Sequence, residues 1–168
     1  IVATLGLVLL LMACGGQVSA EPTPPTIHYG EDICEACGMI ISDARYASAY
    51  ITQDGEGHTF DEIAGMMHTY LEQQPEVIAF FVHDYESQEW IRGEEATYVL
   101  SLDIHTPMGF GLIAFAKVET AHAFATDYKG TKVMHFDELI SHYQHEPLAF
   151  PGPWPRSDQD DHAHRHSK

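Results

Sequence analysis

The segment "HTFDEIAGMMHTYLEQQPEVIAFFV", residues 58–82, carries the clearest pattern of secondary structure in the chain. It begins in extended fashion, and a helix is predicted at 61–74, where apolar residues recur at helical spacing until Pro75 ends the run. The continuous apolar run at 77–82 is consistent with a buried strand. The segment therefore predicts a helix placed between two strands.

Strands and helices are also predicted on both sides of this segment. The strands lie at 46–52, 111–117 and 131–135, and the helices lie at 119–128 and 136–143. Residues 89–92 are compatible with one more strand, whereas residues 94–100 are ambiguous. Together these elements predict an α+β fold.

A short motif occurs twice in the chain. The sequence FDEI at 60–63 has a counterpart in FDEL at 136–139. Each follows an extended segment that contains a histidine, and each opens a predicted helix with an acidic first turn, which suits the helix dipole. A Gly–Met pair precedes each motif, as Gly38-Met39 and, in reversed order, as Met108-Gly109. We therefore predict a degenerate duplication into two small, similar α/β lobes of ββαβ type.

The N-terminus has the composition of an export signal. Residues 1–13 are uncharged and mostly apolar, shorter than the roughly 20 residues that span a bilayer but as long as the apolar region of a signal peptide. The sequence LMAC at 11–14 resembles a bacterial lipobox, so we predict a lipoprotein signal peptide at 1–13 and lipidation of Cys14. An ordinary cleaved signal is the alternative.

The remaining boundaries follow from proline and charge content. Residues 14–27 are predicted to form a flexible tether, and residues 151–168, with three histidines, a disordered tail. Between them, residues 28–150 form the folded domain, with lobes at about 28–84 and 85–150. Acidic residues outnumber basic ones by 25 to 8, for a formal charge of −17, so the surface repels nucleic acid and attracts cations or a basic protein partner.

The sequence "DICEACGMIIS", residues 32–42, contains Cys34 and Cys37. An exported chain meets an oxidising environment, but a disulfide between these residues would close a very small loop and stabilise little. A thioredoxin-type motif follows a strand and opens a helix, whereas this one follows a proline-rich tether and continues with GMII, a poor helix start. Soft thiolate and thioether ligands select copper(I), and Met39 lies two residues beyond Cys37.

The other methionines differ in their surroundings. Met66, Met67 and Met134 lie on predicted apolar faces and are expected in the core. Met108 instead lies in a Pro/Gly-rich loop, where binding residues tend to occur. The pair at 61–62 is more simply a helix first turn than a general acid/base couple, and no G-x-S-x-G hydrolase motif is present.

The elements CEACGM at 34–39, FDE at 60–62 and TPMG at 106–109, together with the lipobox, resemble the NosL family. That resemblance implies a non-enzymatic lipoprotein that binds copper(I) and delivers it for assembly of nitrous-oxide reductase. It further implies two similar α/β lobes, an anchor in a bacterial membrane facing the periplasm or the cell exterior, and an ABC-type membrane complex and the reductase as partners.

The resemblance also suggests a ligand set. Cys37 and Met39 match the family's CGM element and Met108 its PMG element, whereas Cys34 is the less certain member and no particular histidine is indicated. We expect one copper(I) ion bound by Cys37 and Met108, helped by Met39 and by Cys34 or a histidine, in an exposed loop-built site. The alternatives are an exported CxxC thiol–disulfide redox protein and a structural lipoprotein that docks a partner through its acidic surface.

Overall fold

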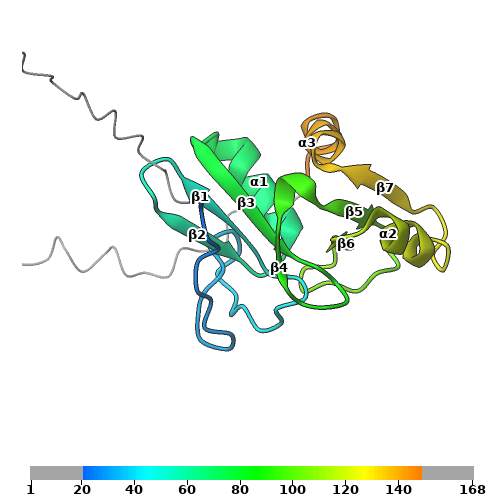
Figure 1. Ribbon diagram of the computed structural model, residues 1–168, viewed down its shortest axis with the longest axis horizontal. Coiled ribbons are helices and arrows are strands. Elements are labelled where there is room, and N and C mark those ends of the chain that lie inside the picture. Colours follow the sequence, from blue (N-terminus) through cyan, green and yellow to red (C-terminus); the bar gives the residue numbers. More distant parts are fainter. Residues whose placement is uncertain (1–20, 149–168) are drawn as a thin grey trace, which may run out of the picture.

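The computed structural model describes residues 21–148 (Figure 1). The predicted signal peptide, the lipidation site Cys14, the first part of the tether and the histidine-containing tail lie outside the described residues. The elements are β1 (Ser48–Thr52), β2 (Gly57–Phe60), α1 (Ile63–Gln73), β3 (Val77–His83), β4 (Trp90–Arg92), a 3-10 turn (Gly93–Glu95), β5 (Thr97–Leu100), β6 (Leu112–Phe115), α2 (Val118–Ala125), β7 (Lys132–His135) and α3 (Phe136–His145).

The described strands form two antiparallel sheets, ordered β2-β1-β3-β4 and β6-β5-β7. In the first sheet β1 pairs with both β2 and β3, and α1 connects β2 to β3. In the second sheet β5 pairs with both β6 and β7, and α2 connects β6 to β7. Each half is thus a ββαβ unit, which confirms the predicted α+β fold of two similar lobes, and Figure 1 shows the two units side by side. Strand β4, beyond residue 84, pairs with β3 of the first sheet.

The repeated FDE motif does not mark equivalent helices. FDEI leads into α1, inside the first unit, whereas FDEL opens α3, which follows the second unit. The acidic first turn predicted for both helices is present in α3, where Asp137 and Glu138 occupy it, but is wrong for α1. Helix α1 begins only at Ile63, because Glu62 has extended backbone dihedrals as the N-cap residue.

One apolar core is shared by the two units. Phe80 of β3 meets Phe136 of α3, with ring centroids 4.9 Å apart, and Tyr98 of β5 reaches the same ring at 6.3 Å. Met66 and Met67 are fully buried in this core and Met134 is 8% exposed, as the sequence predicts. Since α1 and α3 pack into the same cluster, the start of α1 lies where the two units meet.

The junction between the sheets is also hydrogen-bonded. The Asp84 carboxylate accepts a hydrogen bond from the backbone N–H of Ala116 at 2.8 Å, and Tyr85 donates its N–H to the Ala114 carbonyl at 2.8 Å. The end of β3 is therefore fastened to β6, which fixes the loops of one unit relative to those of the other.

Candidate metal centre

The cysteine motif forms a tight closed turn. The Gly38 N–H donates to the Cys34 carbonyl at 2.8 Å, and the Cys34 N–H donates to the Met39 carbonyl at the same distance. Gly38 has φ +73°, a conformation that glycine adopts without the strain a side chain causes. No helix begins directly after the motif. A thioredoxin-type motif opens a helix, so this arrangement argues against a thioredoxin-type site.

Glu35, between the two cysteines, fastens this turn to β2. Its backbone N–H donates to the Thr59 carbonyl at 3.1 Å, and its carboxylate accepts the Thr59 N–H at 3.1 Å. The other carboxylate oxygen lies 2.7 Å from Nδ1 of His58. The turn therefore lies against the strand that leads directly to Asp61 and Glu62.

The two thiols meet a buried carboxylate. Ligand atoms of Cys34, Cys37 and Asp61 all lie within 4.8 Å of one another, and these residues are 1%, 3% and 3% exposed. The Cys37 thiol donates to Oδ1 of Asp61 at 3.5 Å, while Oδ2 has no hydrogen-bond partner within residues 21–148. Thiols beside an unpartnered buried carboxylate oxygen are a donor set that fits a cation. The prediction of an exposed site is wrong for the two thiols. Glu35 holds the cysteine turn against β2 by hydrogen bonds, and the thiols pack into the shared core.

Hydrogen bonds make the two thiols unequal. A hydrogen bond from the Cys34 thiol lowers the pKa of Cys37, and a hydrogen bond from the Met39 N–H acts in the same direction. The same thiol–thiol bond and burial raise the pKa of Cys34. Cys37 is thus the first of the pair to become a thiolate. Because thiolates rather than thiols bind metals, a metal ion that bound here would displace a proton.

The loop that carries Met108 is tied to the start of α1. The Met108 N–H donates to Oε2 of Glu62 at 3.2 Å, and Glu62 follows Asp61 directly. Met39 and Met108 are both half-buried and pack against the apolar cluster that includes the two cysteines. The structure therefore places Cys34, Cys37 and Met39 in one turn. It connects Met108 to that turn through two neighbouring carboxylates.

Sequence reasoning missed the part of the two carboxylates. Asp61 and Glu62 are buried in the position just before α1 rather than in its first turn. Burial raises the pKa of Glu62. The sequence did contain one sign of this role. Asp61 and Glu62 lie between an extended segment and the apolar start of a helix, where side chains can point away from the helix axis.

Comparison with known proteins covers the segments that form this site. The family model for NosL matches residues 25–144, which include the cysteine turn, both carboxylates and the Met108 loop. The chain belongs to the NosL family. One relative, the copper-binding lipoprotein NosL of Stutzerimonas stutzeri, is 27% identical over 140 residues, covering 77% of this chain and 73% of that protein.

A solved structure shares the fold. The crystal structure of the copper chaperone NosL from Shewanella denitrificans matches with a TM-score of 0.62 at 21% identity, covering 70% of this chain and 96% of that one. Within residues 21–148, none of the helices of this NosL-family chain has the length and apolar content needed to cross a bilayer.

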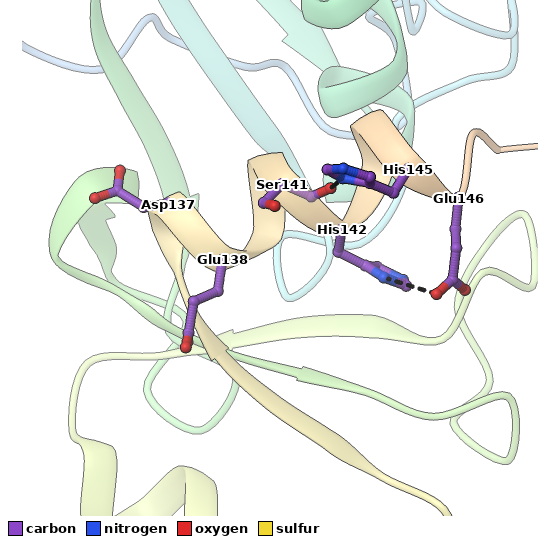
Figure 2. Close-up of a pocket in the computed structure, with 6 residues that line it drawn as sticks. All are labelled: Asp137, Glu138, Ser141, His142, His145 and Glu146. Atoms are coloured by element: carbon purple, nitrogen blue, oxygen red, sulfur yellow. Dashed lines mark hydrogen bonds and ion pairs between the residues drawn. The ribbon is translucent and has the colours of Figure 1, made fainter.

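A second polar hollow lies on the outer face of α3 (Figure 2). It is lined by Asp137, Glu138, Ser141, His142, His145 and Glu146. His145 donates from Nδ1 to the Ser141 carbonyl at 2.7 Å, and His142 lies 3.7 Å from Glu146. The Lys132 ammonium also lies 3.5 Å from Glu146, so a cation is already present there. The cysteine turn is thus the better candidate for a metal centre in this NosL-family chain.

Proposed function

We propose that this chain binds one copper(I) ion and delivers it for the assembly of the metal centres of nitrous-oxide reductase, as a carrier rather than an enzyme. The observation that carries the proposal is the buried pair of unequal thiols beside the Asp61 carboxylate. Membership of the NosL family and the printed names of the relatives support copper as the cargo.

Cys37 and Met108 are the principal ligands in this proposal, and Met39 and Cys34 assist them. Thiolate and thioether sulfurs suit copper(I), and the Cys37 thiolate offsets the charge of the ion. In the ion-free chain the Cys37 thiol donates to Asp61, and loss of that proton on binding leaves the Asp61 side-chain oxygens beside the ion. Since the ligands come from two separate loops, an acceptor's own ligand can replace them one at a time. That stepwise exchange is what a carrier needs in order to release its ion.

Delivery of copper, in this proposal, takes place at a membrane. We propose that lipid on Cys14 anchors the chain to a bacterial membrane, facing the periplasm or the cell exterior, and that residues 14–27 act as a tether. The partners are then an ABC-type membrane complex and the reductase. The name of the Stutzerimonas stutzeri relative as a lipoprotein supports the anchor.

Copper titration under reducing conditions tests the binding step. Competition with a chromophoric copper(I) chelator should give one tightly bound ion, and X-ray absorption should find sulfur bound to it. Cys37→Ser should abolish tight binding and Met108→Leu should weaken it, whereas Met134→Leu, the same change at a buried core methionine, should leave affinity unchanged. A coordination shell of nitrogen and oxygen alone refutes the proposed ligands.

A thiol–disulfide redox protein is the second candidate, favoured by the closeness of the thiols and their opposed pKa shifts. Met108→Leu separates the two functions, because a dithiol cycle does not use a thioether. Copper delivery predicts weaker copper binding and slower transfer to copper-free nitrous-oxide reductase in this variant. Unchanged transfer, together with loss of function in Cys34→Ser, would instead favour the redox protein.

A further inference from the structure

We infer that Glu62 is a positioning residue, which holds the Met108 loop of the second unit against the cysteine turn of the first. The inference rests on the proposed copper site and adds to it a group that does not itself bind the ion. It gives a role to a buried carboxylate whose presence neither helix formation nor core packing explains.

Glu62 holds the loop at two points. Its Oε2 accepts the Met108 N–H at 3.2 Å, and the Thr106 hydroxyl also donates to its carboxylate. Thr106 in turn organises the loop, because its hydroxyl oxygen accepts the Gly111 N–H at 3.1 Å and its carbonyl accepts the Gly109 N–H at 3.0 Å. The turn that presents Met108 is therefore fixed from within by Thr106 and from outside by Glu62.

The stability of the fold does not account for this carboxylate. Glu62 is 1% exposed, and its Oε1 has no hydrogen-bond partner within the described residues. A buried, half-satisfied carboxylate opposes folding, and an apolar side chain of similar size generally serves a core better. Glu62 is the N-cap residue of α1, yet its side chain makes no capping hydrogen bond. Its contacts are instead directed to the loop.

Consecutive carboxylates join the two halves of the site. Asp61 accepts the hydrogen bond of the Cys37 thiol, and Glu62, next in the chain, accepts that of the Met108 backbone. The backbone of residues 61–62 therefore sets the separation between the cysteine turn and the methionine loop. Groups that orient metal ligands in this way commonly alter metal affinity by about 10- to 100-fold when they are removed.

The first test measures the loop without copper. Glu62→Leu and Thr106→Val should each accelerate hydrogen exchange at the Met108 amide, whereas Glu62→Gln and Thr106→Ser, which keep an acceptor and a hydroxyl, should stay near the parent protein. Glu138→Gln is the matched control, because Glu138 lies in the second FDE motif and accepts the His135 N–H at 2.9 Å. Unchanged exchange at Met108 in both Glu62→Leu and Thr106→Val overturns the inference.

The second test uses the copper-loaded protein. Glu62→Leu should weaken copper(I) binding by about 10- to 100-fold and remove one sulfur from the atoms that X-ray absorption finds around copper. In the Met108→Leu background, Glu62→Leu should add little further loss, since both changes act through the same ligand. An equal loss in both backgrounds overturns the inference. If Glu62→Leu does not fold, Thr106→Val is carried through the same measurements.

The two proposals fail in different ways. If Met108→Leu binds copper as the parent protein does, the ligand set is wrong, whatever the effect of Glu62→Leu. If Met108→Leu weakens binding but Glu62→Leu and Thr106→Val do not, copper binding stands and the positioning role is refuted.

Discussion

Gly109→Ala and Gly111→Ala form a matched pair of substitutions in the methionine loop. Both glycines have positive φ, +78° and +69°, so alanine at either position incurs the cost of a left-handed backbone, roughly 1 kcal/mol. A Cβ on Gly109 would meet nothing within 4 Å. A Cβ on Gly111 would lie 1.9 Å from the Ser101 carbonyl oxygen. The difference between the two variants therefore isolates a steric clash with backbone.

The size of that clash follows from what has to move. Ser101 donates its N–H to the Gly111 carbonyl at 3.0 Å, so relieving the contact separates the end of β5 from its partner segment. Overpacking costs about 1–3 kcal/mol and the strained hydrogen bond about 1 kcal/mol. We expect Gly111→Ala to lower the unfolding free energy by roughly 3–5 kcal/mol and Gly109→Ala by about 1 kcal/mol.

Urea unfolding followed by circular dichroism measures both values. With each kcal/mol shifting the melting temperature of a domain of this size by roughly 3–6 °C, thermal scans should separate the variants clearly. Equal destabilisation by the two substitutions would refute the reasoning, because it would mean that the loop accommodates a Cβ at residue 111 without disturbing Ser101.

Two further predictions concern pH and the cysteine turn. Burial holds the pKa of His83 below 6.5, and its ring donates to the Gln88 carbonyl at 2.8 Å. The unfolded chain therefore takes up the proton first, so the stability this neutral ring contributes is present above about pH 6.5 and is lost as pH falls below it. His83→Gln should flatten that loss in urea titrations between about pH 5 and pH 8, and an unchanged slope would contradict the assignment. Glu35→Ala removes the bonds to Thr59 and His58, so we expect a loss of about 1 kcal/mol in unfolding free energy, with weaker copper(I) binding. Glu35→Gln keeps an acceptor for Thr59, so its unfolding free energy and copper affinity should lie closer to those of the parent protein. An unchanged copper affinity in Glu35→Ala would exclude a role in copper binding for the hydrogen bonds of the Glu35 carboxylate.

Local patterns predicted most of the elements, because each depends on residues close together in sequence. The apolar spacing around Met66 and the run at 77–82 correspond to α1 and β3. Residues 94–100 were ambiguous because they contain a 3-10 turn followed at once by β5, two elements too short to show a period. The likeness of the FDE motifs was misleading, because three identical residues say nothing of the place of a helix in the order of strands.

The site was harder to predict, because its geometry depends on contacts between distant segments. The motifs indicated soft metal ligands from residue types alone. Burial of Cys34 and Cys37 arises from Glu35 and β2, which lie more than 20 residues apart in the chain. The link from Glu62 to Met108 joins residues 46 apart. Such pairings follow from the packing of the two units and leave no periodic signal in either segment.

The core shared by the two ββαβ units has a consequence for their independence. Phe80 in the first unit is covered by Phe136, the first residue of the helix that follows the second unit, and the end of β3 is bonded to β6. A fragment that ends between the units would therefore expose aromatic surface that water solvates poorly, even though its own strands could pair. Two units of the same topology thus form one indivisible folding entity. The proposed copper site takes ligands from both units, so it requires the whole domain to be folded, and degradation of either half would remove it.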